Sequence, residues 1–396
     1  MRNLASLILC SGFLALSQTA TAGPQPCGWP LKVTGSGLTN IAFPDTNATY
    51  WVMPVDTTRW QAMIVKGTYT RSRFFSFTAY FDFRQPSPKV VDYIIDSNIN
   101  PDSGSTNPFQ PPESTPAAGT DTGSYTITFD GNASGPGNHV QWANGEITYI
   151  LYRIYVADKG LSDQAGAPLP ALTLVDNSGN EDILSACPVE IGSGSALSDL
   201  IAALEDSPLV PQESCAASQP QATQVTFTPN NVGGGRFFPN PVTTYFSARG
   251  LCPEAGKIVV VRGQAPDFPD TYTGGSIFQP HLPGSIQLRY WSMCNNKEEV
   301  PGPVVACKAD YDTPLDAQNF YTYVVSTDST QPAWIPPGVA WLPWGDPAIQ
   351  NALLFRDMLP ASNFTLSGPY MPTGVFCDKQ TFIEQGWQAC FATAQP

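Results

Sequence analysis

Three short blocks in the first half of the chain recur, in the same order, in the second half. Each pair of blocks shares aromatic, proline, glycine or arginine residues at matching places. The pairs are 43–51 with 238–246, 63–67 with 259–263, and 73–76 with 289–292. Repeated blocks in one order are typical of a duplicated structural unit. The sequence therefore predicts two copies of one domain in tandem, with extra residues within 264–287 of the second copy.

The residues around these blocks have the composition of β-strands. The chain has 396 residues, and its 33 Gly and 39 Pro interrupt it too often for long helices. Runs rich in Val, Ile, Thr and Tyr lie at 125–129, 147–156 and 320–326. We therefore expect a mainly β fold of two tandem, duplicated β-sandwich or jelly-roll-like domains. A short linker helix is expected at 195–206 and a short C-terminal helix at 378–389.

The expected domain boundaries follow the changes in composition. Residues 1–22 contain Arg2, an apolar run and the sequence Ala-Thr-Ala, which is typical of a signal peptide cleaved near Ala22. The first domain is expected at 23–190, a linker at 191–222, and the second domain at 223–396. No run of eighteen apolar residues occurs, so no membrane span is expected. These observations indicate a secreted or periplasmic protein.

Removal of Cys10 with the signal peptide leaves eight cysteines, an even number that predicts disulfide bonds in an exported protein. The spacing favours four disulfide pairs. Three of them flank a turn or a predicted helix, and the fourth would tie the two halves together. They are Cys294–Cys307, Cys377–Cys390, Cys187–Cys215 and, as the remainder, Cys27–Cys252. No Cys-x-x-Cys motif is present, which disfavours a cysteine metal site. No metal is therefore assigned.

Several motifs resemble exported bacterial proteins built from paired domains of unknown function. The motifs are Arg-Tyr-Trp-Ser at 289–292, the strand at 321–325, Pro332, Trp-Leu-Pro at 341–343, and Arg356, with a weaker similarity over 43–160. The first half has no Trp-Leu-Pro sequence. The resemblance implies tandem jelly-roll-like β-domains, and it implies no established reaction.

The sequence assigns no catalytic residues. The net charge of −14 argues against nucleic-acid binding. Only two histidines are present, and no Gly-x-Ser-x-Gly motif occurs. Acidic clusters that could serve glycosidic cleavage are Asp92, Asp96 and Asp102, and Asp310, Asp312 and Asp316; solvated acidic loops are the simpler interpretation. No cofactor is predicted. Oxygen-bearing side chains at 176–182 resemble the start of a calcium loop, so a structural calcium ion remains open.

Arginines and aromatic residues give the candidate ligand site. Arg73 and Arg289 occupy matched positions, and Arg153 and Arg356 lie within apolar runs, where a charge needs a partner. They could line a pocket for an acidic or planar ligand, or they could form internal bridges repeated by duplication. Trp334, Trp341 and Trp344 form a stiff aromatic segment that could bind a ligand or fill the core. The candidate site comprises Arg289, Trp291, Trp341, Trp344 and Arg356, with Arg73 and Trp51.

The sequence favours an exported, non-catalytic β-sandwich protein that binds a glycan or a small planar or apolar ligand. One alternative is an extracellular hydrolase or lyase that uses Asp with Arg or Tyr. The other is a cell-surface structural protein. The partner is expected to be a small molecule or glycan.

Overall fold

The structure is a computed structural model that describes residues 27–81, 89–111, 123–185, 187, 214–215, 222–230 and 238–393. The expected signal peptide and the expected linker helix lie outside these residues. We call residues 27–187 the first half and residues 214–393 the second half. Each half contains two five-stranded sheets. The mainly β, duplicated architecture predicted from the sequence is confirmed.

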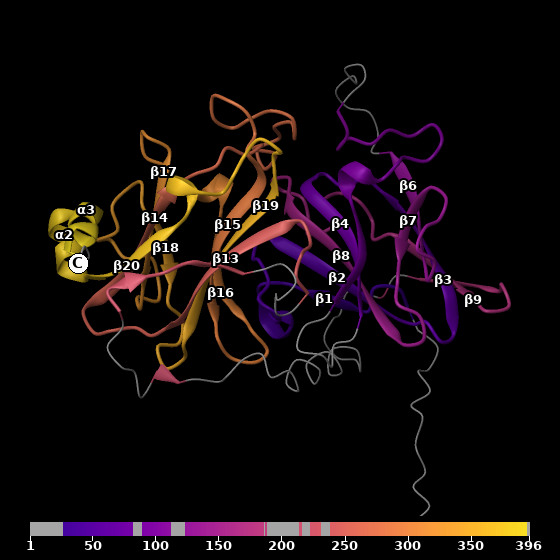
Figure 1. Cartoon of the computed structure of the whole chain (residues 1–396), viewed down its shortest axis with the longest axis horizontal. Coiled ribbons are helices and arrows are strands. Elements are labelled where there is room, and N and C mark those ends of the chain that lie inside the picture. The colour runs from indigo at the N-terminus through magenta and orange to yellow at the C-terminus, as the bar shows by residue number, and fades with distance from the viewer. Residues whose placement is uncertain are drawn as a thin grey trace, which may run out of the picture.

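In the first half, the inner sheet faces the second half and the outer sheet lies at the far end of the molecule (Figure 1). The inner sheet has the order β1 (Leu31–Val33), β2 (Ala48–Asp56), β8 (Ile147–Ala157), β4 (Ser72–Phe81), β5 (Lys89–Ile95). The outer sheet has the order β10 (Glu181–Leu184), β9 (Ala171–Asp176), β3 (Trp60–Thr68), β6 (Ser124–Asp130), β7 (Asn138–Gln141).

The second half repeats this arrangement. Its inner sheet has the order β12 (Thr228–Asn230), β13 (Thr243–Leu251), β19 (Asn351–Pro360), β15 (Leu288–Lys297), β16 (Val304–Ala309). Its outer sheet has the order β11 (Gln224–Val225), β20 (Thr373–Asp378), β14 (Lys257–Gln264), β17 (Phe320–Ser326), β18 (Ala340–Pro343). Short 3-10 helices lie at η1 (Gly37–Thr39), η2 (Asp96–Asn98), η5 (Asp310–Asp312) and η6 (Gly368–Tyr370).

The two halves agree strand by strand except at one edge of the outer sheet, where β10 comes from the end of the first half and β11 from the start of the second half. The agreement includes the exceptional pairing. All described pairings are antiparallel except β6 with β7 and the equivalent β17 with β18, which are parallel. The matched glycines have the same role in both halves. Gly67 and Gly263 lie opposite Tyr125 and Tyr321 in the neighbouring strands. A Cβ on either glycine would lie within 2.5 Å of the tyrosine hydroxyl, so only glycine leaves room for the ring.

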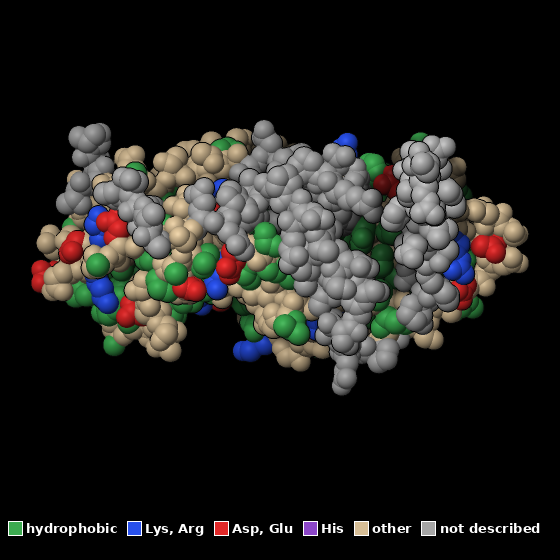
Figure 2. Space-filling view, turned by 90° about the horizontal axis from the view of Figure 1, so that it is seen from below, with side chains coloured by type: hydrophobic (Ala, Val, Ile, Leu, Met, Phe, Trp, Pro, Cys, Tyr) green, Lys and Arg blue, Asp and Glu red, His purple; other side chains and the backbone are tan. Residues whose placement is uncertain are grey.

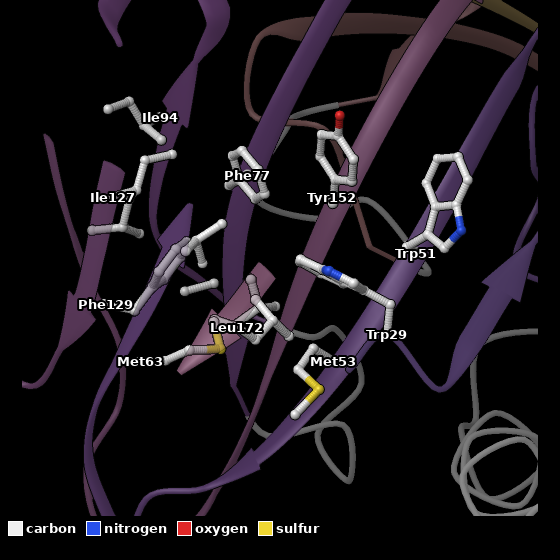
Figure 3. Close-up of a cluster of buried hydrophobic side chains, with 14 of the residues drawn as sticks. Trp29, Trp51, Met53, Met63, Phe77, Ile94, Ile127, Phe129, Tyr152 and Leu172 are labelled. Carbon is white, nitrogen blue, oxygen red and sulfur yellow. The ribbon is translucent and has the colours of Figure 1, made fainter. Parts of the chain in front are cut away.

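The inner sheets are buried on both faces, which explains their almost continuous apolar sequences. In β8, Ile150, Tyr152 and Ile154 pack into the core of the first half. The alternate residues Leu151 and Tyr155 belong to a separate cluster with residues of both halves. Figure 3 shows Tyr152 among the aromatic and aliphatic side chains of the first core. Arg153 lies on the same face as Leu151, so its charge is directed at the contact between the halves.

The C-terminal residues form two short helices rather than the single one expected at 378–389. Helix α2 (Lys379–Gln385) begins after Asp378, whose side chain accepts a hydrogen bond from the Thr381 amide. It ends at Gly386, where φ is +78°, and α3 (Trp387–Thr393) follows. The two helices lie at the end of the second half, beside its outer sheet (Figure 1).

All eight predicted cysteines form disulfide bonds, but two predicted pairs are wrong. Cys294–Cys307 and Cys377–Cys390 are confirmed. In place of Cys187–Cys215 and Cys27–Cys252, the structure has Cys27–Cys187 and Cys215–Cys252. The reason is the path of the chain. The Gly28 amide donates to the Ser185 carbonyl, so the start of the first half lies beside its end, whereas the Cys215 amide donates to the Ala348 carbonyl in the second half. Each bond therefore stabilises one half, and none joins the halves.

Candidate functional site

A cavity lies between the two inner sheets, where equivalent residues of both halves meet. Its free volume is about 80 Å³, enough for several water molecules or one small organic ligand. The wall is mostly apolar and aromatic, with three arginines. It comprises Val33, Ile41, Ala42, Phe43, Pro44, Tyr50, Val52, Leu151, Arg153, Tyr155, Phe238, Pro239, Asn240, Tyr245, Arg249, Leu354 and Arg356.

An approximate two-fold relation passes through the cavity. Arg153 of the first half donates to the Phe238 carbonyl of the second half at 2.9 Å. Arg356 of the second half donates to the Phe43 carbonyl of the first half at 2.5 Å. Phe43 and Phe238 both adopt positive φ angles, 51° and 57°, which turn these loops in the same way. The duplication has therefore produced two equivalent Arg–carbonyl contacts, and each of them joins the two halves.

The positive charge of the wall is not matched by acidic side chains of the wall. Arg249 pairs with Glu298 at 2.7 Å outside the lining. Arg153 is buried and donates to the Thr78 and Tyr80 hydroxyls, which are neutral. Within the described residues, no carboxylate forms an ion pair with it. On the surface, by contrast, several Lys and Arg side chains lie beside Asp or Glu (Figure 2).

The arginines stay charged despite their burial. Burial alone would lower the pKa of Arg153, but Tyr80, Tyr155 and Tyr245 favour the charged form and raise the pKa above its usual value. For Arg356, burial is likewise outweighed, here by Asp45 and Tyr50, so that its pKa is also raised. The hydroxyl of Tyr80 stays protonated, because burial raises its pKa to about 12 although Arg153 opposes the rise. The site therefore presents fixed positive charges and neutral hydroxyls.

The two ends of the cavity differ at one matched position, Asp45 and Asn240. Both residues donate their backbone N–H to the hydroxyl of the matched tyrosine, Tyr50 or Tyr245, at 3.2 and 3.0 Å. Their side chains have different environments. The Asp45 carboxylate lies 3.9 Å from Arg356 and accepts hydrogen bonds from the Tyr290 and Ser292 hydroxyls, at 2.8 and 2.6 Å.

At the other end, Asn240 supplies no charge. Its Oδ1 accepts a hydrogen bond of 3.4 Å from the Val242 amide, and its buried Nδ2 has no partner. Phe74 stands where Tyr290 stands in the second half and has no hydroxyl to offer. Ser76, which matches Ser292, has a buried hydroxyl without a partner. The Arg153 end therefore keeps the arginine and the serine hydroxyl of the motif, but it lacks the tyrosine hydroxyl and the carboxylate.

Two of the predicted site residues, Arg73 and Arg289, form reciprocal bridges between the halves outside the cavity wall. Arg73 is fully buried and contacts Asp310 of the second half. Arg289 lies 3.4 Å from Asp96 of the first half. Burial raises the pKa of both Asp96 and Asp310 to about 6, although the arginines oppose the rise. Of the two interpretations of these arginines offered by the sequence, this geometry corresponds to internal bridges repeated by duplication.

The predicted tryptophans lie in three different places. Trp51 packs against Tyr152 in the first core, with ring centroids 5.6 Å apart (Figure 3). Trp291 and Trp344 lie in the core of the second half. Trp341 packs in an outer cluster with Trp334 and with residues of the C-terminal helices. Of the seven predicted residues, Arg356 is the one that lines the cavity.

Sequence reasoning noted Arg153 as a charge in an apolar run but did not include it in the site, and it missed Tyr50, Tyr245 and Asn240. The available signal was the duplication itself. Tyr50 and Tyr245 occupy matched places in the first repeated block, and Asn240 replaces Asp45 there. Because the tyrosine is present in both copies of the block, the two copies are expected to have the same structural environment.

The acidic clusters are divided among separate partners. Asp310 binds Arg73, Asp312 accepts from Lys308 at 3.1 Å and from the Ala309 amide, and Asp316 pairs with Arg262. Asp92 accepts a hydrogen bond from the Gln141 amide, and Asp102 accepts one from the Ser124 hydroxyl. The interpretation as solvated acidic loops is wrong for Asp96 and Asp310, which are buried in the bridges between the halves. The other carboxylates stabilise turns and strand ends in the described structure.

The residues that could bind a metal ion are already engaged in hydrogen bonds or in a disulfide bond. In the expected calcium loop, Asp176 Oδ1 accepts from the Ser178 and Asn180 amides, and its Oδ2 accepts from the Asn180 side chain, so the carboxylate closes the turn between β9 and β10. Asp45, Cys294 and Cys307 place potential ligand atoms within 4.8 Å of one another. The two sulfur atoms are joined in a disulfide bond, which removes the thiolates that a metal would need.

Comparison with known proteins identifies the fold and no activity. No family model matches the sequence, and no curated protein matches it. An uncharacterized protein from Burkholderia cenocepacia has a similar structure, with a TM-score of 0.56 and 13% identity, over 89% of this chain and 82% of that chain. A protein from Vibrio parahaemolyticus gives a TM-score of 0.41 and 11% identity, over 84% of this chain and 89% of that chain. The Burkholderia cenocepacia structure supports the expected resemblance to bacterial proteins of unknown function at the level of fold.

One observation bears on the expected location. The four disulfide bonds are compatible with an oxidising compartment outside the cytoplasm. Among the described residues, neither helix is long or apolar enough to cross a membrane.

Proposed function

We propose that this protein is an exported, non-catalytic binding protein for a small anionic ligand with an apolar body, held in the cavity between the halves. One observation carries the proposal: Arg153 is buried in a wall that has no acidic residue, and no described carboxylate pairs with it, in a chain with a net charge of −14. A buried guanidinium group without a carboxylate is costly unless another anion accompanies it. A bound anion would supply that partner.

The other wall residues suit the rest of such a ligand. Val52, Leu151 and Leu354 offer apolar surface, and Tyr50 and Tyr245 combine ring faces with hydroxyl groups. A mostly apolar wall with a few placed polar groups is the usual composition of a small-molecule site. Arg and Tyr are residues that bind and orient a ligand, so the composition favours binding over the alternative of hydrolysis by paired carboxylates.

The test is isothermal titration of the purified, oxidised protein with hexanoate, a small anion with an apolar chain. Val52→Phe should block the cavity and weaken hexanoate binding at least tenfold. Ile183→Phe is the matched control, because it adds an aromatic ring on the exposed side of β10, and it should bind as the wild type does. Absence of binding to the wild type, or equal binding by the Val52→Phe variant, would overturn the proposal.

A further inference from the structure

We propose that the ligand carries a single carboxylate, and that this head group binds at the Arg153–Asn240 end of the cavity, in the role that Asp45 has at the Arg356 end. This inference rests on the proposed function and adds the chemical class of the ligand and its orientation. It follows from comparing two copies of one motif within the same molecule.

The complete copy shows which group the motif binds. At the Arg356 end, the guanidinium group and the hydroxyls of Tyr290 and Ser292 surround the Asp45 carboxylate. Asp45 is buried, and its other oxygen accepts hydrogen bonds from the backbone and side chain of Asn47. A carboxylate in this position is therefore both charge-compensated and fully hydrogen-bonded.

The incomplete copy keeps the arginine and the serine but lacks the carboxylate and, because Phe74 replaces Tyr290, one hydroxyl donor. Arg153 matches Arg356, Ser76 matches Ser292, and Asn240 replaces Asp45. Asn240 and Ser76 are only 2% and 1% exposed, and the Asn240 Nδ2 and the Ser76 hydroxyl lack partners. Buried donors without acceptors are rare in folded proteins because each one loses its hydrogen bonds to water. A ligand carboxylate beside Asn240 and Arg153 would supply the missing acceptor and the missing charge.

The charge balance favours one negative charge on the ligand. Arg249 is compensated by Glu298, and Arg356 lies near Asp45, which leaves Arg153 as the wall arginine without a described carboxylate. A second carboxylate on the ligand would have to lose its water and approach the end that already contains Asp45. Like charges at short range in a buried site repel strongly.

The strand register places the apolar body next to this head group. Arg153 on β8 is paired with Tyr50 on β2, and the next pair on the same face is Leu151 with Val52. Both members of that pair line the cavity. A ligand whose carboxylate meets Arg153 would therefore lay its hydrocarbon part over Leu151 and Val52.

The first experiment compares three probes on the wild-type protein by calorimetry: hexanoate, its neutral analogue hexanamide, and the dicarboxylate adipate. Hexanoate should bind at least tenfold more tightly than either of the others. Equal binding of adipate would overturn the requirement for a single charge. If hexanoate fails to bind, or binds no more tightly than hexanamide, the proposed function itself fails.

The second experiment tests the position of the head group with Asn240→Asp, which places a carboxylate beside Arg153. Hexanoate affinity should fall at least tenfold, because the new side chain takes the place of the ligand carboxylate, while hexanamide affinity should stay within threefold of the wild type. Asn177→Asp, on the exposed turn after β9, adds the same charge outside the cavity and should have no effect. If a folded Asn240→Asp variant binds hexanoate as the wild type does, the head-group position is wrong and the proposed function stands. The probe comparison on the wild type tests the ligand class even if this variant does not fold.

Discussion

Replacing Asp357 with Asn should remove a pH dependence from the stability of the second half. Asp357 on β19 follows Arg356, as Ile154 follows Arg153 on β8, so a carboxyl group occupies a position where the first half has a core isoleucine. The side chain is only 5% exposed. Burial raises its pKa to about 8, and no described group opposes the rise.

The size and sign of the effect follow from the linkage between protonation and folding. The unfolded carboxyl has a pKa of about 4, and each unit of difference corresponds to about 1.4 kcal/mol. The upper bound is therefore about 6 kcal/mol, and structural relaxation should reduce it to about 2–4 kcal/mol. Because the folded pKa is raised, the folded protein binds more protons than the unfolded chain between pH 4 and pH 8. Asp357 therefore makes the free energy of unfolding decrease as the pH rises through this window.

The assay is urea unfolding of the oxidised protein at pH 5, 6.5, 8 and 9, for the wild type and for Asp357→Asn. The variant should become the more stable of the two as the pH rises, with the largest difference at pH 8 and above. Glu181→Gln, an exposed acid on β10, should show no such trend. The reasoning is refuted if the difference between wild type and Asp357→Asn is constant from pH 5 to pH 9, or if it changes in favour of the wild type.

Two further substitutions test the contacts that the duplication created. Arg73→Met should destabilise the protein by about 3–5 kcal/mol in urea unfolding, because it leaves the buried Asp310 carboxylate without its cation. The double variant Arg73→Met/Asp310→Asn should recover most of the loss, and Arg289→Met, whose side chain is partly exposed, should cost less; a double variant no better than Arg73→Met would contradict the bridge. Gly263→Ala should cost about 1–3 kcal/mol in the same assay, because the new Cβ would lie 2.2 Å from the Tyr321 hydroxyl oxygen. Adding Tyr321→Phe should restore part of the stability, and an unaffected Gly263→Ala variant would show that the close contact is not maintained in solution.

The elements of the fold could be predicted because their signals are local. Gly and Pro spacing and β-branched runs are visible within short windows of sequence, and each repeated block is itself a short segment that can be matched directly to its copy. The two confirmed disulfide bonds, Cys294–Cys307 and Cys377–Cys390, also close short loops. The two incorrect pairs depended on where distant segments of the chain meet. Nothing near Cys27 in the sequence indicates that its neighbour Gly28 pairs with Ser185 at the end of the first half.

The candidate site could be predicted only in part, because the inner strands are buried on both faces. In a strand with one solvent-exposed face, apolar and polar residues alternate, and this alternation shows which side chains point into the core. In β2, Tyr50 and Trp51 are both buried, yet Trp51 packs in the first core and Tyr50 lines the cavity. Their sequence environments do not distinguish these two destinations. The partners of Arg153 and Arg356 lie in the opposite half, and only the packing of the halves brings them together.

The duplication itself supplies the comparison that a single copy cannot. In an exposed turn, Asp and Asn are close replacements, and the two blocks beginning at Phe43 and Phe238 read as nearly the same sequence. In a buried site the same replacement changes the charge next to an arginine, which is worth several kcal/mol and cannot be absorbed by water. A copy that had merely drifted would be expected to lose the arginine with its acid, since an uncompensated guanidinium is costly. Arg153 has instead been kept with hydroxyl partners at Thr78 and Tyr80. We infer that the missing charge at Asn240 is supplied from outside the chain, which is why the point of difference between the halves is where we place the ligand.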